Sequence, residues 1–255
     1  MKVSILQHNI ILGALHSTLS SLEKMLLQHS GADLYVLSET FATGFLAEGS
    51  SALAQEQGPQ ILAWMQQQAA RFDAAIAGRV AVKDDEGLLR NRFYFVRPDG
   101  TFDYYDKRHL FSYAGETREY VAGDRRVVVS WRGVRFLLQV CYDLRFPVFS
   151  RSLGDYDAII YVACWPEKRI DAWQSLLKAR AIENQCFVVG VNRVGADAVC
   201  QYSGCSVVHD AYGRIIASCA PNIEEVSTAT FDMDALQRFR RKFPVLADAD
   251  GFSLG

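Results

Sequence analysis

Strand-like and helix-like apolar patterns alternate along the whole chain, and this alternation limits the available folds more than any other feature. Short apolar runs at 3–7, 34–37, 74–82, 158–163 and 187–192 are typical of buried strands. Apolar residues at helical spacing separate most of these runs. Buried strands that alternate with helices predict sheets covered by helices on their outer faces, which is a layered α/β architecture.

Two hairpins and a group of C-terminal strands complete the predicted pattern. Pro98-Asp99-Gly100 and Arg132-Gly133 are turn sequences between apolar runs. The other predicted elements are helices at 19–27, 61–72, 169–184 and 233–242, and strands at 92–96, 101–105, 127–131, 134–140, 203–208, 214–217 and 227–231.

Length and composition indicate one domain over 1–255, because no linker or low-complexity segment interrupts the pattern. Charged residues make up 22% of the chain and the formal net charge is −2, which favours neither nucleic acid nor a membrane surface as a partner. No apolar run reaches the roughly 20 residues that span a bilayer, and the N-terminal run predicts a strand rather than a secretory signal.

All six cysteines lie in the second half of the sequence, mostly within apolar segments. This distribution indicates reduced thiols and a cytoplasmic location. Only Cys200 and Cys205 lie near each other, without a second pair of the same form, so we predict no structural zinc.

Three chemically distinctive residues follow predicted strands. Glu39 comes after 34–37, Lys107 after 101–105, and Cys141 directly after 134–140. Ligands collect beyond the carboxyl ends of strands in α/β sheets, so these side chains could share one site. A thiol nucleophile, a carboxylate that accepts its proton and an ammonium that stabilises an oxyanion can together cleave an amide. This chemistry needs neither a metal nor an organic cofactor.

Four sequence blocks resemble a known family. They are L-S-E-T-F-A-T-G-F (37–45), Y-D-K-R-H-L-F (105–111), C-Y-D-L-R-F-P (141–147), and W-P-E-K-R-I-D-A-W-Q-S-L-L-K-A-R-A-I-E-N-Q (165–185) followed by V-G-V-N-R-V-G (189–195). The first three look like the signature blocks of the nitrilase (carbon–nitrogen hydrolase) superfamily. The fourth is similar to the ω-amidase branch, and the blocks with the strands between them cover nearly the whole chain.

The resemblance implies a four-layer α-β-β-α sandwich of two mixed sheets, assembled as a homodimer or larger homo-oligomer. It implies Cys141 as the nucleophile, Glu39 as general base and acid, and Lys107 as the oxyanion stabiliser. The backbone N–H of Tyr142 would be a second oxyanion donor, and Glu116 would orient the lysine.

The ω-amidase resemblance also implies a small-molecule substrate, the monoamide of a dicarboxylate. 2-Oxoglutaramate is the first candidate and 2-oxosuccinamate the second. Arg145 is our choice for binding the far carboxylate, because a guanidinium pairs with a carboxylate through two hydrogen bonds. Phe41 and Trp165 are the predicted apolar walls.

The sequence departs from the family pattern at two positions and leaves other functions open. Ser38 stands where relatives usually carry Pro, and Cys164 stands where ω-amidase-like relatives often carry Asn. Nitriles, N-carbamoyl compounds or other amides could be the substrates of the same three residues. A redox-sensing thiol pair, Cys141 with Cys164, and a catalytically silent interaction module are the non-hydrolase alternatives. His109 and His209 are predicted to be structural.

Overall fold

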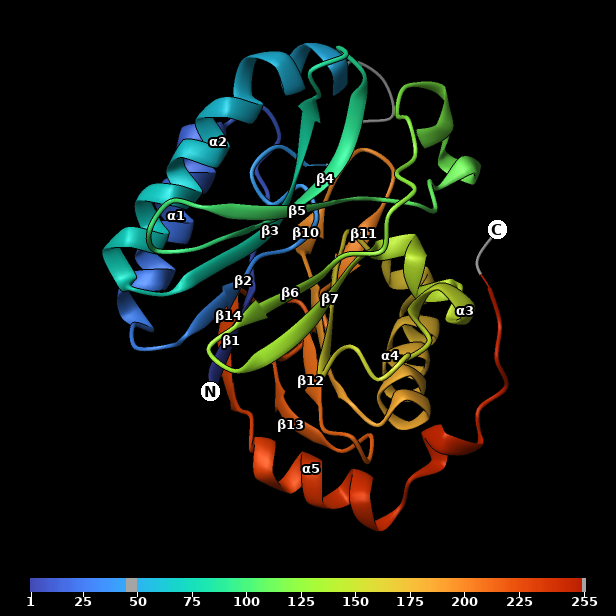
Figure 1. The fold of residues 1–255 in the computed structure, drawn as a ribbon. Coiled ribbons are helices and arrows are strands. Elements are labelled where there is room, and N and C mark those ends of the chain that lie inside the picture. The colour runs from blue at the N-terminus through green and yellow to red at the C-terminus, as the bar shows by residue number, and fades with distance from the viewer. Residues whose placement is uncertain (45–49, 254–255) are drawn as a thin grey trace.

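The computed structural model describes residues 1–44 and 50–253, and most of its strands form two six-stranded mixed sheets that face each other (Figure 1). The first sheet has the order β14-β1-β2-β3-β4-β5, with β1 (Lys2–Gln7), β2 (Leu34–Val36), β3 (Ala75–Lys83), β4 (Leu89–Val96), β5 (Phe102–Asp106) and β14 (Glu225–Thr230). The second has the order β13-β12-β9-β8-β7-β6, with β6 (Val128–Trp131), β7 (Val134–Val140), β8 (Ala158–Ala163), β9 (Phe187–Asn192), β12 (Val207–His209) and β13 (Ile215–Ser218).

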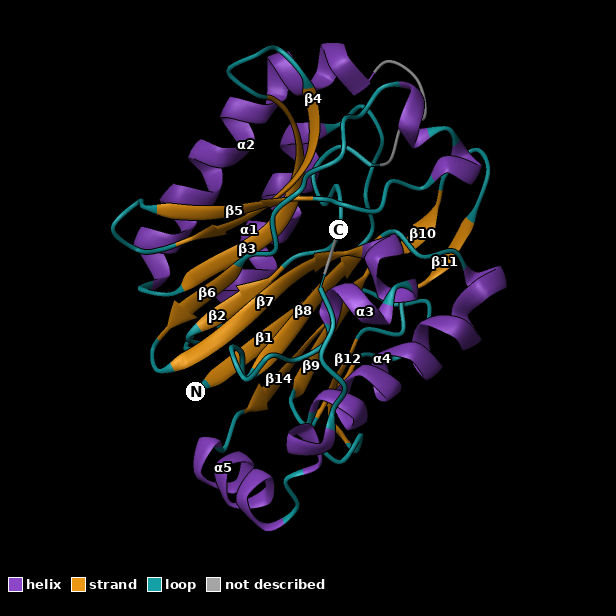
Figure 2. Ribbon diagram, turned by 45° about the vertical axis from the view of Figure 1, so that its right-hand side comes forward, coloured by secondary structure: helices purple, strands orange, loops and turns teal. Residues whose placement is uncertain are grey.

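Helices cover the outer faces of both sheets (Figure 2). The helices α1 (Leu15–Gln28) and α2 (Ser50–Phe72) lie on the first sheet, whereas α4 (Ile170–Asn184) lies on the second. The short α3 (Pro147–Ser150) precedes β8, and α5 (Met233–Lys242) packs against one end of the core between the sheets. The α-β-β-α sandwich implied by the sequence blocks is therefore confirmed. Within the described ranges, every helix is too short or too polar to cross a membrane.

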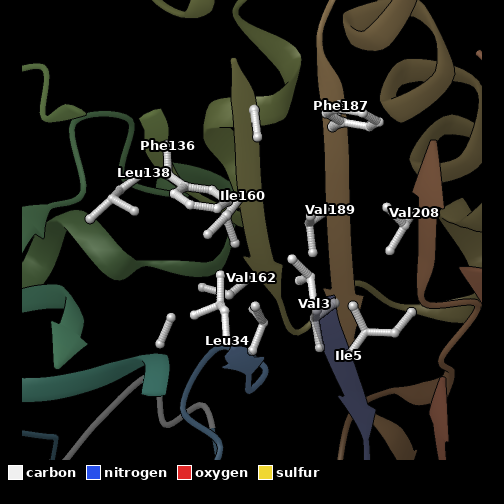
Figure 3. Close-up of a cluster of buried hydrophobic side chains, with 14 of the residues drawn as sticks. Val3, Ile5, Leu34, Phe136, Leu138, Ile160, Val162, Phe187, Val189 and Val208 are labelled. Carbon is white, nitrogen blue, oxygen red and sulfur yellow. The ribbon is translucent and has the colours of Figure 1, made fainter. Parts of the chain in front are cut away.

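Strands at the centre of each sheet are buried on both faces, which explains their continuous apolar sequences. Because side chains alternate along a strand, Ile160 and Val162 of β8 point between the sheets, whereas Ile159 and Tyr161 point toward α4. Figure 3 shows the core between the sheets, where Val3 of β1 lies among side chains of the second sheet.

One predicted strand is wrong. The segment 203–208 begins at the last residue of β11 (Gln201–Ser203) and ends within β12, and these two strands lie in different sheets. β11 pairs with β10 (Val194–Ala196) in a small two-stranded sheet. Gly204 and Cys205 separate the strands with φ of +73° and +56°, a left-handed backbone that cannot continue a strand. The apolar pattern alone does not reveal this break.

Candidate active site

Four strands of the two sheets end beside one another and deliver the chemically distinctive residues. Glu39 lies just past β2, and Lys107 directly follows β5. From the facing sheet, Cys141 directly follows β7 and Cys164 directly follows β8. The strands β2 and β5 run in the same direction, since β2 is parallel to β3 and two antiparallel pairings lead from β3 to β5. Their ends therefore meet at one edge, as for ligand sites in other α/β sheets.

Glu39 is a buried carboxylate with three polar partners. Its Oε1 accepts hydrogen bonds from Lys107 Nζ at 3.3 Å and Asn91 Nδ2 at 3.1 Å. Its Oε2 accepts one from the backbone N–H of Cys164 at 3.0 Å. Burial by itself would raise the pKa of Glu39. The cations Lys107 and Arg79 outweigh burial, with help from these hydrogen bonds, and lower the pKa of Glu39 below its usual range. Glu39 is thus an anion that can accept a proton.

Lys107 is buried between two carboxylates. Its Nζ donates to Glu116 Oε2 at 2.9 Å as well as to Glu39. Glu116 is itself held by the backbone N–H of Phe111, which donates to Oε2 at 2.6 Å. Burial would lower the pKa of Lys107, but the negative charges of Glu116 and Glu39 overcome this and raise it. The lysine is therefore a fixed ammonium that can stabilise negative charge.

Cys141 borders the cavity at the start of a 3-10 helix, Cys141–Arg145. Its φ of +47° is a left-handed conformation that non-glycine residues rarely adopt and that often marks functional sites. Burial raises the pKa of the Cys141 thiol well above its usual range, and the negative charge of Glu39 adds to this effect while Lys107 opposes it. In the resting site the thiol is neutral and the neighbouring carboxylate is charged.

Sequence reasoning missed Asn91 and Arg79, which support the two glutamates. Asn91, on β4, donates through Nδ2 to Glu39 at 3.1 Å and to Glu116 at 2.5 Å. Its Oδ1 accepts a hydrogen bond from Nε of Arg79, on the neighbouring β3. The guanidinium of Arg79 lies over the ring of Tyr120, 5.2 Å from its centroid. Neither residue is in a signature block, so no signal in the sequence pointed to them.

Asp143 joins the segment that carries Lys107 to the segment that carries Cys141. Its Oδ2 accepts hydrogen bonds from Tyr105 Oη and the backbone N–H of Val140, both at 2.9 Å. Its Oδ1 accepts two from His109, at 3.0 Å from the backbone N–H and 2.8 Å from Nδ1. These bonds bridge the two sheets beside the site.

A cavity of about 560 Å³ opens beside this cluster, within the size range of small-molecule sites. Glu39, Lys107 and Cys141 all line it. Its other walls are mostly aromatic or aliphatic, including Leu12, Phe111, Tyr113, Ala114, Trp165, Pro166, Ala198, Val199 and Tyr202. A small molecule with apolar carbon atoms could therefore be held against the three reactive groups.

Two of the three residues predicted to bind substrate line the cavity, and one does not. Arg145 and Trp165 line the cavity, and the Arg145 guanidinium lies 5.0 Å from the centroid of the indole. Tyr142 lines it as well, and its backbone N–H is in the first turn of a helix, where such groups lack a partner within the helix. Phe41 does not line it. Its buried ring packs against Trp64 of α2, on the outer side of the first sheet.

The remaining sequence predictions concern histidines and thiols. His109 bonds to Asp143, and the buried His209 lies with Nδ1 3.2 Å from the carbonyl oxygen of Gly213.

All six cysteines are free. Cys164 is buried, and its Sγ lies 3.1 Å from the carbonyl oxygen of Glu39. Among the described side chains, no group of three or more His, Cys, Asp or Glu is arranged to hold a metal ion. Phe45, the last residue of the first signature block, lies outside the described residues.

Comparison with known families assigns the class of protein. The model of the family described as carbon-nitrogen hydrolase matches residues 2–241. The chain therefore belongs to the carbon–nitrogen hydrolase family, and the resemblance stated from the sequence blocks is confirmed.

Individual relatives place the chain more narrowly. It is 45% identical over 256 residues to omega-amidase YafV of Escherichia coli (strain K12), covering 100% of this chain and 98% of the relative. It is 31% identical over 250 residues to the 2-oxoglutaramate amidase of Bacillus subtilis (strain 168), covering 96% of each chain. Among solved structures, XC1258 of Xanthomonas campestris, described as a CN-hydrolase superfamily protein with an arsenic adduct in its active site, superposes with a TM-score of 0.95 and 40% identity over 100% of this chain and 99% of that one.

Proposed function

We propose that this protein hydrolyses the terminal amide of a small dicarboxylate monoamide, with 2-oxoglutaramate as the first candidate substrate. One observation carries the proposal. Glu39, Lys107 and Cys141 converge from separate strands on one cavity that can hold a molecule of this size. The similarity to an omega-amidase and to a 2-oxoglutaramate amidase supports the choice of substrate.

In the first half-reaction, the Glu39 carboxylate takes the Cys141 proton while the sulfur attacks the amide carbon. The carbonyl oxygen becomes an oxyanion, which Lys107 Nζ and the backbone N–H of Tyr142 stabilise. When the tetrahedral intermediate collapses, the carbon–nitrogen bond breaks and Glu39 gives its proton to the departing nitrogen. Ammonia leaves, and the acyl group stays on the sulfur as a thioester.

In the second half-reaction, Glu39 takes a proton from water as the water oxygen attacks the thioester carbon. The carbon–sulfur bond then breaks, and the proton returns to Cys141. The net reaction consumes one amide and one water and yields one carboxylic acid and one ammonia. Glu116 holds the Lys107 ammonium through two hydrogen bonds, so its role is to orient that group.

For the substrate's far carboxylate, we assign Arg145 as a partner and Trp165 as the apolar wall beside it. The guanidinium lies over the indole in the cavity wall, and a guanidinium on an aromatic ring keeps its N–H donors available. Arg145→Ala should raise KM for 2-oxoglutaramate with a smaller change in kcat.

We also propose that the protein forms a homodimer or larger homo-oligomer and that it is cytoplasmic. Light scattering on the purified protein measures the size of the assembly.

The decisive experiment measures ammonia release from 2-oxoglutaramate, 2-oxosuccinamate, a simple nitrile and an N-carbamoyl amino acid. The wild-type protein should favour the two monoamides. Cys141→Ala should reduce release to background, because no other group in the mechanism can form the thioester. Cys205→Ala is the matched control, since Cys205 is a free thiol that does not line the cavity. Undiminished release by Cys141→Ala would refute the mechanism, and preference for the nitrile or carbamoyl compound would replace the substrate.

A further inference from the structure

The charged side chains that line the cavity differ in whether they already bond to protein groups. Glu39 and Lys107 bond to each other. The second acid among the described lining residues is Asp197, whose Oδ1 accepts backbone hydrogen bonds from Val199 and Cys200, both at 2.8 Å. Its Oδ2 accepts a hydrogen bond from the hydroxyl of Tyr202 at 2.7 Å. Both oxygens of Asp197 thus already accept hydrogen bonds from residues 199–202.

Among the described residues of the cavity wall, the other charged side chains are those of Arg145 and Arg169. Within residues 1–44 and 50–253, neither forms an ion pair with an acidic side chain. Arg145 lies over the ring of Trp165, and Arg169 lies 5.5 Å from the ring centroid of Phe111. Both guanidiniums therefore rest on aromatic faces rather than on carboxylates.

Trp165 connects the two arginines. Its ring lies beneath the Arg145 guanidinium, and its Nε1 donates a hydrogen bond of 2.7 Å to the backbone carbonyl of Arg169. The arginines therefore lie on either side of Trp165 in the cavity wall. Glu39, Lys107 and Cys141 line the same cavity. A guanidinium on an aromatic ring keeps its N–H donors available and is well suited to a carboxylate.

We propose that Arg169 is a second carboxylate-binding residue beside Arg145. This pair selects amides that carry no ammonium group on the carbon next to the carboxylate, such as 2-oxo acid amides, over α-amino acid amides such as glutamine. The inference deepens the proposed function and rests on it. The α-ammonium of glutamine is attached to the carbon next to the carboxylate, so it would approach both guanidiniums. Among the described residues that line the cavity, the two carboxylates, Glu39 and Asp197, already accept hydrogen bonds from protein groups, and like charges at a binding site are strongly disfavoured. A 2-oxo group at the same carbon instead accepts hydrogen bonds from a guanidinium.

The kinetic test compares wild type with Arg169→Met on 2-oxoglutaramate, glutamine and pentanamide, an uncharged amide of the same chain length. We expect kcat/KM for 2-oxoglutaramate to fall about 10- to 100-fold, the loss for a hydrogen bond to a charged group, with most of the change in KM. The ratios of kcat/KM for 2-oxoglutaramate to those for pentanamide and for glutamine should both fall. Arg169→Lys should restore part of the first ratio. Lys168→Met is the matched control, because Lys168 is the exposed neighbour of Arg169 and does not line the cavity.

A binding test separates this inference from the proposed reaction. Calorimetric titration of the Cys141→Ala variant with 2-oxoglutarate, which carries the same 2-oxo acid end, needs no turnover. Adding Arg169→Met should weaken that affinity about 10- to 100-fold, and adding Lys168→Met should not. Equal affinity with and without Arg169 would overturn the assignment even if the wild type hydrolyses 2-oxoglutaramate. A loss of affinity would support it even if the natural amide proves to be another carboxylate-bearing compound.

Discussion

Arg79 matters because it balances charge in the buried cluster beside the cavity. Glu39 and Glu116 bring two negative charges into the buried cluster, and Lys107 brings one positive charge. Arg79, which is fully buried, supplies the second positive charge. An unbalanced buried charge is costly, and carboxylates respond by binding protons. Arg79 thus keeps Glu39 ionised through its charge, and it positions Asn91 through a hydrogen bond.

Replacing Arg79 with Met should move the acidic limb of the pH dependence of kcat/KM to higher pH. The base in the proposed mechanism is ionised Glu39, whose pKa Arg79 lowers. Without that charge the pKa of Glu39 rises, so protonation inactivates the enzyme at a higher pH. We expect a shift of about one pH unit, the lower end of the effect of a nearby opposite charge. Rate measurements from pH 3 to 7 provide the test, since the wild-type limb lies below the usual range of a glutamate.

Arg92→Met is the control for this shift. Arg92 is on β4 next to Asn91 in sequence, but it pairs with Asp106 at 2.8 Å and lies over the ring of Tyr104. Its loss should lower stability and leave the acidic limb in place. The same limb in the Arg79→Met variant and the wild type would show that Arg79 is only a structural residue.

Asp143→Asn should lower kcat about 100-fold with a modest loss of stability, since displacement of reacting groups by about 1 Å can cost this much. The new amide group would face donors that now bond to a carboxylate oxygen, which loosens the link between the loops of Lys107 and Cys141. Steady-state kinetics and thermal melts check both effects. Asp103→Asn, on β5 with a side chain 45% exposed, is the control and should retain wild-type kcat. Unchanged kcat in Asp143→Asn would contradict the positioning role.

At the scale of elements, hydrogen bonds of Gln7 hold the chain at the break between β11 and β12. Gln7, at the end of β1, accepts a hydrogen bond from the Ser206 N–H at 2.9 Å and donates to the carbonyls of Ala220 and Ile223. It fits there because Gly204 has no side chain. A Cβ on Gly204 would lie 2.2 Å from the side chain of Gln7. The turn therefore depends both on a left-handed backbone and on empty space.

Gly204→Ala should accordingly destabilise the protein by about 3 kcal/mol, the combined effect of a strained left-handed residue and the loss of hydrogen bonds of Gln7. Urea denaturation measures the change in the free energy of unfolding. Gly87→Ala is the matched control, because Gly87 has nearly the same φ, +77°, with nothing within 4 Å of the added Cβ. It should cost only about 1 kcal/mol. Equal losses in the two variants would mean that the contact with Gln7 has no energetic weight.

The sequence predicts an element well when a local pattern of apolar residues defines it, and poorly when contacts with distant residues define it. The predicted strands 158–163 and 187–192 and the helix 233–242 have the observed bounds of β8, β9 and α5, since each is a continuous pattern with clear ends. The strand 203–208 failed because the two left-handed residues inside it are set by tertiary neighbours.

The residues of the site also differ in whether the sequence reveals them. Glu39, Lys107, Cys141 and Glu116 could be found because they lie in or near recognisable sequence blocks. Arg79 and Asn91 could not, because their function arises only when β3 and β4 pair beside the glutamates. Phe41 was placed in the cavity because a block indicates that a residue is near a site, not which face of the sheet it occupies.

At the scale of the whole molecule, Asp157 connects three parts of the second half. Its carboxylate accepts hydrogen bonds of 2.9 Å from Arg135 of β7 and from Arg240 of α5, and it directly precedes β8. Burial opposes ionisation of Asp157, but the arginines prevail and lower its pKa below 3.8. A carboxyl group whose pKa is lower in the folded state stabilises the protein above its unfolded pKa, and this stabilisation is lost as the pH falls through the folded pKa.

Asp157→Asn should therefore cost about 3 kcal/mol at pH 6, the lower end for removing one partner of a buried ion pair, since Arg135 is partly exposed. Near pH 3, wild-type Asp157 begins to protonate and the two proteins should approach each other in stability. Urea denaturation at pH 6, 4 and 3 measures this convergence. Asp85→Asn, an exposed acid in the turn after β3, should differ little from wild type at each pH. A difference between Asp157→Asn and wild type that stays constant from pH 6 to 3 would mean that Asp157 contributes through packing rather than through its charge, and the hold of Arg240 on the core would then come from its bonds to the carbonyls of Gln185 and Tyr156.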